Sequence, residues 1–452
     1  MASHTNLFLT LFLLSTVIFP IQISNAASKT YLLPIIKDIK TPQYYTTLLV
    51  GTPQVRVNLA IDLGNLWSWF TCDIVGYNRS STFHPVSCDA PECDTYGRFG
   101  CVGCPDGPLK PSCTPINTCG AIAYSPQSNA LYSGGAIEDV ISLYSQSQNS
   151  AQLVKTNLRD YPFTCAPDKG PLKGLSPFTK GILTLARRPV ALHAQISSAF
   201  KVPNKFALCL PATSNLGKNN GAMYFGGGPY RLPSTSKIDL SSSLVTTPLV
   251  INPNSTAPTY SVGDSSIEYF FNVRSIKVDG VPVRFKSSLL SFDKDGVGGT
   301  KISTLDPYTI LHSDIYKSLI EVFVTRAKSM NITRVPSVAP FGACFSEKSV
   351  TRTKTGPNIP IIDLIFNEKS SVLHNKNGRW RIYPTNSMVN VAKKDVMCLG
   401  FVDGGSDPRT SIVIGGKQME DNLIEFDLVE NKLGVTSSLL HLGTSCSQFK
   451  GI

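Results

Sequence analysis

The sequence is poor in charge, and its charged residues are not concentrated in a block. Asp, Glu, Lys and Arg make up 16% of the 452 residues, and there is no long Lys or Arg run, low-complexity segment or short repeat. Nucleic-acid binding needs a concentrated basic stripe or aromatic platforms, so that class is disfavoured. The net charge of +11 is dispersed. It favours contact with acidic surfaces such as pectin-like polysaccharides or acidic enzymes, although solubility alone also accounts for it.

Long apolar runs are absent after the first 26 residues. Residues 1–26 contain no Asp, Glu, Lys or Arg, residues 7–23 are largely apolar, and small residues follow at Ser24, Ala26 and Ala27. We therefore predict a cleaved secretory signal peptide over residues 1–26 rather than a membrane anchor. No later run approaches the ~20 apolar residues that a spanning helix needs. About 425 residues remain, enough for two domains of a secreted protein.

The cysteines follow the predicted signal peptide, and their even number in a secreted chain predicts up to six disulfide bonds, with the pairing left open. Cys101 and Cys104 have the spacing of half a zinc site. No second Cys-x-x-Cys or His pair accompanies them, so we expect a disulfide-stapled loop and no metal or cofactor. Sequons at Asn78, Asn254 and Asn331 predict N-glycosylation. The cysteines are Cys72, Cys88, Cys93, Cys101, Cys104, Cys113, Cys119, Cys165, Cys209, Cys344, Cys398 and Cys446.

Short strand-like runs separated by turn residues cover most of the chain, which predicts an all-β protein with few short helices. Helical periodicity is scarce, and the best candidates are residues 313–328 and 192–200. A polar, Pro- and Ser-rich stretch at residues 231–258 is the expected seam between domains. We accordingly predict two β lobes, residues 27–235 and 236–452.

Motifs in both halves carry a resemblance to a known fold. Residues 59–64 read Leu-Ala-Ile-Asp-Leu-Gly, and Tyr124 lies downstream at the distance of a flap tyrosine. Near the C-terminus, residues 411–416 and 425–435 match the last strands of a second lobe. The chain therefore resembles a pepsin-type aspartic protease, and more closely a plant subgroup of that fold. The resemblance implies a bilobal pepsin-like fold with a disulfide-rich insertion in the first lobe, in which Asp62 holds a catalytic position.

The second aspartate of that fold has no counterpart at its expected position. The chemistry needs two carboxylates that share one proton, and aligning residues 298–300 with the family places Ser303 where the second belongs. A serine hydroxyl cannot replace that acid. Asp306 would restore it after a register slip, but Pro307-Tyr308 follows in place of Thr-Gly or Ser-Gly. We predict that the chain is not a protease and that Asp62 is a retained structural acceptor.

Three further departures from the protease pattern agree with this prediction. Leu63 lacks a hydroxyl that braces the catalytic pair in the family, and Pro126 is expected to disrupt the flap hairpin. Thr184 and Ala186 stand where the family often has glycine. Together these residues favour a protein that keeps the protease fold and has lost the protease activity.

A narrower resemblance rests on the single Asp, the Lys-Ile-Ser-Thr segment, and residues 335–345 and 403–416. These features are similar to those of plant inhibitors of microbial cell-wall hydrolases, above all xyloglucan-specific endo-β-glucanase inhibitors and the extracellular dermal glycoprotein. The resemblance implies a secreted, apoplastic defence protein that plugs a glycosidase active site. The alternatives are a xylanase inhibitor, a basic 7S globulin-like storage or ligand-binding protein and, last, an active aspartic endopeptidase.

Basic loop residues are the candidates for contact with a hydrolase. A retaining glycosidase presents two carboxylates about 5 Å apart, and a guanidinium pairs bidentately with carboxylate oxygens. Arg409 lies in a Gly-rich, Pro-stiffened loop and is the first candidate. The alternative is that Arg409 is an ordinary solvated loop arginine with no role in binding. Arg326, Lys328 or Arg334 is expected to add a second basic group, although helix ends often carry Arg or Lys to suit the dipole. His374 is a further candidate, and the alternative is that it lies in an ordinary surface turn with no role in binding.

Overall fold

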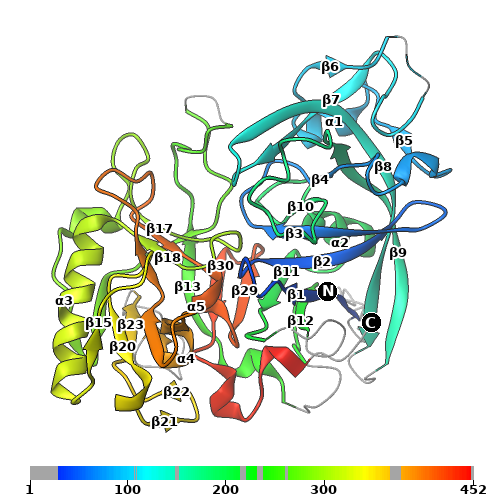
Figure 1. Cartoon of the computed structure of the whole chain (residues 1–452). Coiled ribbons are helices and arrows are strands. Elements are labelled where there is room, and N and C mark those ends of the chain that lie inside the picture. The colour runs from blue at the N-terminus through cyan, green and yellow to red at the C-terminus, as the bar shows by residue number, and fades with distance from the viewer. Residues whose placement is uncertain are drawn as a thin grey trace, which may run out of the picture.

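The computed structural model describes residues 29–105, 107, 109–147, 152–213, 220–231, 238–259, 263–366 and 378–448. They form two β-rich lobes side by side, with strands of both lobes meeting between them (Figure 1). The predicted all-β class with few short helices is confirmed. The expected boundaries at residues 26 and 235 and the predicted signal peptide lie outside the described residues. Within the described ranges, no helix combines the length and apolar character needed to cross a bilayer.

The first lobe is organised by a long antiparallel pair of strands, β8 and β9. Their register runs from Ala136 opposite Thr164 to Gln146 opposite Leu153, with an irregularity at Asp139. The inward side chains of this pair join the main hydrophobic core, because alternate residues of a strand point to the same face. The strands of this half are β1 (Lys29–Lys37), β2 (Tyr44–Val50), β3 (Val55–Asp62), β4 (Trp69–Phe70), β5 (His84–Pro85), β6 (Cys101–Val102), β7 (Thr118–Ser125), β8 (Ala130–Ser147), β9 (Leu153–Cys165), β10 (Gly181–Thr184), β11 (Lys205–Cys209) and β12 (Gly221–Phe225).

The second lobe combines its share of the large sheet with two four-stranded sheets and one two-stranded sheet. Helix α3 (Ser313–Ser329) packs on this lobe at its outer side (Figure 1). The strands of this half are β13 (Val245–Val250), β14 (Phe270–Phe271), β15 (Ser275–Val278), β16 (Val281–Pro282), β17 (Thr300–Ile302), β18 (Thr309–Leu311), β19 (Arg334–Val335), β20 (Cys344–Ser346), β21 (Arg352–Thr353), β22 (Gly356–Pro357), β23 (Ile362–Ile365), β24 (Arg379–Ile382), β25 (Met388–Asn390), β26 (Val396–Leu399), β27 (Phe401–Asp403), β28 (Ile412–Ile414), β29 (Leu423–Asp427) and β30 (Lys432–Val435).

The two lobes share one continuous set of paired strands. In the order β1, β12, β11, β29, β30, β13, the first three strands come from the first half of the chain and the last three from the second half. The junction is β11 against β29, from Lys205 opposite Asp427 to Cys209 opposite Leu423. A disulfide bond between Cys209 and Cys446 covers the same junction. This shared sheet fixes the two halves against each other, so loops from both can form one site.

The two predicted helices are present. α2 (Leu192–Phe200) has the predicted bounds, and α3 extends the predicted helix by one residue. Ile315, Leu319 and Phe323 recur at helical spacing on α3 and are fully buried, which explains why this segment is a helix on a β lobe. The other helices in the described ranges are short: α1 (Pro91–Tyr96), α4 (Pro384–Ser387) and α5 (Gly416–Met419).

Five disulfide bonds join ten of the twelve cysteines, all of which lie in described ranges. They are Cys72–Cys165, Cys88–Cys101, Cys93–Cys119, Cys209–Cys446 and Cys344–Cys398. Cys104 and Cys113 are free thiols, so the expectation that these two cysteines also take part in disulfide bonds is not met. The two thiols are nevertheless neighbours, and a hydrogen bond to Cys104 raises the pKa of Cys113. The dense cysteine segment is therefore a stapled insertion of the first lobe, as predicted.

Candidate functional site

Each lobe places one loop at the junction, and the two loops follow equivalent strands. β3 ends at Asp62 and pairs in parallel with β10, while β17 pairs in parallel with β28. Asp62 is the last residue of β3 and pairs with Thr184, whereas Ser303 comes directly after Ile302, the last residue of β17. The Thr304 hydroxyl donates to the Ile61 carbonyl oxygen at 2.6 Å and joins the two loops.

Asp62 is a buried carboxyl with one unused oxygen. Its residue is 6% exposed, Oδ1 accepts the Gly64 N–H at 3.0 Å, and Oδ2 has no hydrogen-bond partner in the described ranges. Burial raises its pKa to about 6, against the lowering effect of the Gly64 hydrogen bond. Across the junction, the Ser303 hydroxyl accepts the Asp306 N–H at 3.2 Å. A hydroxyl engaged in this way cannot share a proton as a second carboxyl does.

A second acid that the sequence analysis did not single out lies near Asp62. Glu268 Oε1 is 2.5 Å from Lys301 Nζ, and both side chains are largely buried. Glu268 packs over Gly64, where an added Cβ would come within 3.1 Å of its Cγ. The negative charge of Glu268 raises the pKa of Asp62 and the positive charge of Lys301 lowers it, each less than burial does. The junction thus holds an ion pair beside a single carboxyl, rather than two carboxyls sharing one proton.

The substituted positions around Asp62 are well packed. Leu63 is 1% exposed and belongs to the main core. The Thr184 hydroxyl donates to the Asn65 carbonyl oxygen at 2.5 Å, and the Thr184 N–H donates to the Ser68 hydroxyl at 3.0 Å. Apolar contact thus fills the position of Leu63, and Thr304 of the second lobe supplies a hydrogen bond from one loop to the other.

The flap hairpin is intact, so the expectation that Pro126 disrupts it is wrong. β7 and β8 stay paired from Gly120 opposite Gly135 to Ser125 opposite Ala130. Pro126 follows the last pair and lies in the turn, where its missing N–H removes no ladder hydrogen bond. Tyr124 on this hairpin donates from its hydroxyl to Asn129 Oδ1 at 3.1 Å.

Arg409 lies on the other side of the junction, in the loop between β27 and β28. We call residues 404–411 the Arg409 loop. Arg409 is exposed, its guanidinium donates to the Thr256 carbonyl oxygen, and its own carbonyl oxygen accepts the Gly298 N–H at 3.0 Å. Burial raises the pKa of Tyr124, and Arg409 acts against that shift. The guanidinium is therefore close enough to the flap for its charge to act on Tyr124.

The other predicted basic residues do not all gather at this loop. Arg326 Nε is 3.8 Å from Asp279 Oδ2. It lies near the far end of α3, about 20 Å along the helix from Ser313, whose N–H donates to the Gly405 carbonyl oxygen of the Arg409 loop. The structure therefore does not bring Arg326 to Arg409. His374 lies outside the described residues.

Arg334 is an exposed residue on β19, beyond the C-terminal end of α3. Its guanidinium donates to the Gly342 carbonyl oxygen at 3.4 Å, and the Gly342 N–H donates to the Tyr316 hydroxyl at 2.9 Å. Tyr316 belongs to the first turns of α3, next to the loop. Through Gly342, Arg334 is thus linked to the end of α3 whose Ser313 N–H contacts the Arg409 loop.

Two basic residues beside the Arg409 loop were not predicted. Burial acts to raise the pKa of Asp403, at the start of the loop, but hydrogen bonds from Ser313 and Gly405 lower it, and Lys317 and His312 add to the lowering. Lys317 is exposed. Its position, one turn into a helix that begins against the loop, is visible only once α3 is packed on β27.

The three sequons differ in accessibility. Asn78 and Asn331 are exposed, as glycosylation requires. Asn254 is partly buried, and its side-chain amide donates to the Lys294 carbonyl oxygen at 2.7 Å. A glycan at Asn254 would have to replace that hydrogen bond, so Asn78 and Asn331 are the better-placed acceptors.

Comparison with known proteins places this geometry in a family. Family models described as "Xylanase inhibitor N-terminal" and "Xylanase inhibitor C-terminal" match residues 44–227 and 268–437. A curated relative from Nicotiana benthamiana, "Probable aspartic proteinase GIP2", is 43% identical over 93% of this chain and 92% of its own length.

Solved structures agree with the sequence relatives. The crystal structure of edgp matches with a TM-score of 0.85 and 40% identity, over 93% of this chain and 98% of that one. The structure of conglutin gamma, described as a basic 7S globulin from lupine seeds, matches with a TM-score of 0.76 and 30% identity, over 94% and 99%. The expected bilobal pepsin-like fold is therefore confirmed.

Proposed function

Because the chain belongs to the xylanase-inhibitor family of pepsin-like proteins, we propose that it is a secreted inhibitor of microbial cell-wall glycoside hydrolases. Its proposed target is a xyloglucan-specific endo-β-1,4-glucanase in the apoplast, and its proposed activity includes no proteolysis. The single observation that carries this proposal is the exposed Arg409 guanidinium on a loop whose backbone is held from three sides. Contact with acidic wall polysaccharide, which the net charge of +11 favours, is a secondary role.

The proposed mechanism is occupation of the glycosidase cleft by Arg409. A planar guanidinium donates two parallel hydrogen bonds to a carboxylate, and the catalytic carboxylates of a retaining glycosidase lie about 5 Å apart. The Thr256 and Gly298 contacts hold the side chain and backbone of Arg409 before binding, which lowers the entropy lost on complex formation. Arg334 and Lys317 supply positive charge on the same side, which speeds encounter with an acidic cleft.

Arg409→Ala tests the mechanism directly. We expect inhibition of a microbial xyloglucan endoglucanase to weaken by about 30-fold or more, because a central interfacial arginine is typically a hot spot. Residual enzyme activity is measured against inhibitor concentration. Arg352→Ala is the matched control, since Arg352 is exposed on β21 and its loss should leave inhibition unchanged. Full inhibition by Arg409→Ala would remove Arg409 from the role.

The same assay separates the alternatives. Inhibition of a xylanase but not of the endoglucanase would favour the xylanase inhibitor, and inhibition of neither would favour the globulin-like storage or ligand-binding role. Glu268 lies beside Asp62, which makes a direct test for proteolysis worthwhile. Pepstatin-sensitive proteolysis by the purified protein at acid pH would overturn the proposal that it is not an enzyme.

A further inference from the structure

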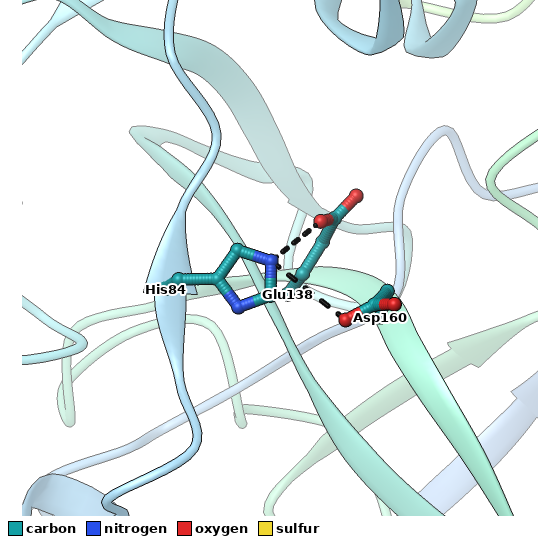
Figure 2. A group of neighbouring side chains, drawn as sticks. All are labelled: His84, Glu138 and Asp160. Carbon is teal, nitrogen blue, oxygen red and sulfur yellow. Dashed lines mark hydrogen bonds and ion pairs between the residues drawn. The ribbon is translucent and has the colours of Figure 1, made fainter.

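Three potential metal ligands meet on the first lobe, away from the junction between the lobes. His84 on β5, Glu138 on β8 and Asp160 on β9 point their side chains toward one another (Figure 2). His84 Nε2 is 2.9 Å from Glu138 Oε2 and 3.8 Å from Asp160 Oδ1, and one donor atom of each residue lies within 4.8 Å of the others. The strand register explains why these three side chains are close together. His84 on β5 pairs directly with Glu138 on β8, and Asp160 lies on β9 at the irregularity in its pairing with β8.

These spacings fit a metal centre as well as an ordinary hydrogen-bonded ion pair. Zn²⁺ binds His nitrogen and carboxylate oxygen at about 2.0–2.2 Å, so two ligands of a tetrahedral ion lie about 3.3 Å apart. The two measured separations bracket that value. The ion would take the place of the proton between His84 and Glu138, and the three ligand atoms, which lie within 4.8 Å of one another, would draw in around it.

The central ligand is positioned before any ion arrives. The Glu138 side chain is 10% exposed, and its second oxygen, Oε1, accepts the Tyr96 hydroxyl proton at 2.6 Å. Burial raises the pKa of Tyr96 beyond its normal range, and Glu138 raises it further, so Tyr96 stays a donor at any ordinary pH. A donor bonded to the far oxygen of a ligating carboxylate is the usual outer-shell support of a metal site.

The cluster opens into a cavity of about 420 Å³, which leaves room for a water or an external ligand at the fourth position. Glu92 and Arg159 also line this cavity. With neutral His84, the charges of Glu138, Asp160 and Glu92 outweigh that of Arg159, so the local balance favours a cation. The His84 and Asp160 side chains are 50% and 69% exposed, which provides the entry path.

We propose that His84, Glu138 and Asp160 bind one Zn²⁺ ion through Nε2, Oε2 and Oδ1, with Tyr96 as a positioning residue. Binding releases any proton held by the imidazole, so affinity falls at acidic pH. The ion joins edge strand β5 to β8 and β9, and its open position faces the cavity. This site is separate from the Arg409 loop and does not depend on the proposed inhibitory function.

Titration of the purified full-length secreted protein with Zn²⁺, followed by calorimetry at neutral pH, tests the proposal. We expect one saturable site in the wild type. His84→Asn should weaken it at least tenfold, and Asp160→Asn likewise, because each removes a ligand. His441→Asn is the matched control, since His441 packs on Tyr383 in the other half of the chain, and it should bind as the wild type does.

Tyr96→Phe adds a readout that keeps every ligand. Loss of the hydrogen bond to Glu138 should weaken Zn²⁺ binding about 10–100-fold, and circular dichroism confirms that each variant is folded. Visible absorption of bound Co²⁺ then reports whether the His84 nitrogen is a ligand, since the bands should shift or vanish in His84→Asn. Absence of saturable binding in the wild type, or unchanged affinity and Co²⁺ spectrum in His84→Asn, would overturn the proposal.

Discussion

The Asp62 carboxyl is buried and only partly hydrogen-bonded in the part of the chain that the structure describes. A carboxyl with one hydrogen-bonded oxygen and one unpaired buried oxygen is costly to ionise, which is why burial is the largest cause of its raised pKa. In a working pair such a shift is useful, because one carboxyl must hold the proton. Ser303 offers no second carboxyl with which Asp62 could share a proton. The neighbouring carboxylate of Glu268 is paired with Lys301.

Asp62→Asn should flatten the pH dependence of stability. The pKa of Asp62 rises from 3.8 to about 6 on folding, so between these values the folded state holds more protons than the unfolded state. Stability therefore falls as pH rises through this window, by an amount that approaches about 3 kcal/mol for this group. The variant should gain most over the wild type at pH 7 and least at pH 4, as measured by urea unfolding at both.

The pH slope will not vanish entirely in this variant. Burial also raises the pKa of Asp421 to about 6, with the same sign of effect on stability. The expected result is therefore a smaller slope. An unchanged difference between the two proteins at pH 4 and pH 7 would show that Asp62 does not titrate in this window.

At the scale of elements, the Arg409 loop is shaped by its neighbours. Its N-terminal end is tied by Ser313, whose N–H donates to Gly405, and its C-terminal end by Ser411, whose carbonyl oxygen accepts the His312 N–H at 2.8 Å. Both donors precede or begin α3. The helix, which packs through Ile315 and Leu319, thus positions a loop that it does not contain. Gly405 has φ of 90°, a conformation that side chains rarely adopt.

Gly405→Ala should weaken inhibition without changing charge. An added Cβ meets nothing within 4 Å, so the expected cost of about 1–2 kcal/mol comes from backbone strain alone. We expect the loop to relax and the inhibition constant for the endoglucanase to rise several-fold. Gly443→Ala is the control, because Gly443 also has positive φ and open space but lies in another loop. Equal loss of inhibition in both variants would count against loop geometry as the cause.

At the scale of the whole molecule, the lobes act as one platform because they share strands and a disulfide bond. The β11–β29 junction and the Cys209–Cys446 bond both lie where the halves meet. The bond closes a 237-residue separation, so in the chain-entropy model it restricts the unfolded chain more than any local bridge does. The hydrogen bond from Thr304 to Ile61 and the position of the Glu268–Lys301 pair beside Asp62 depend on this fixed arrangement.

Replacing Cys209 and Cys446 together with Ser should destabilise the protein by about 5 kcal/mol, against about 4 kcal/mol for the pair Cys344 and Cys398, which close 54 residues. Calorimetry measures both. We also expect the first variant to become sensitive to limited proteolysis between the lobes, whereas the second should not. An unchanged melting temperature in the first variant would show that the shared sheet alone holds the halves together.

The sequence by itself determined the β class, the two lobes and both longer helices, because strand periodicity, helix spacing and contiguous motifs are local. The assignment of Ser303 to the position of a second aspartate stays a prediction. Only the tertiary structure decided the rest. The prediction that Pro126 disrupts the flap hairpin was wrong, because the strand register decides whether a proline lies within the hydrogen-bonded strands or in the turn that follows them. Arg326 was separated from Arg409 by the length of α3, and Glu268 with Lys301 was brought to Asp62 by the meeting of two lobes. His84, Glu138 and Asp160 lie on three strands with no motif between them, since their proximity depends on pairing and not on spacing.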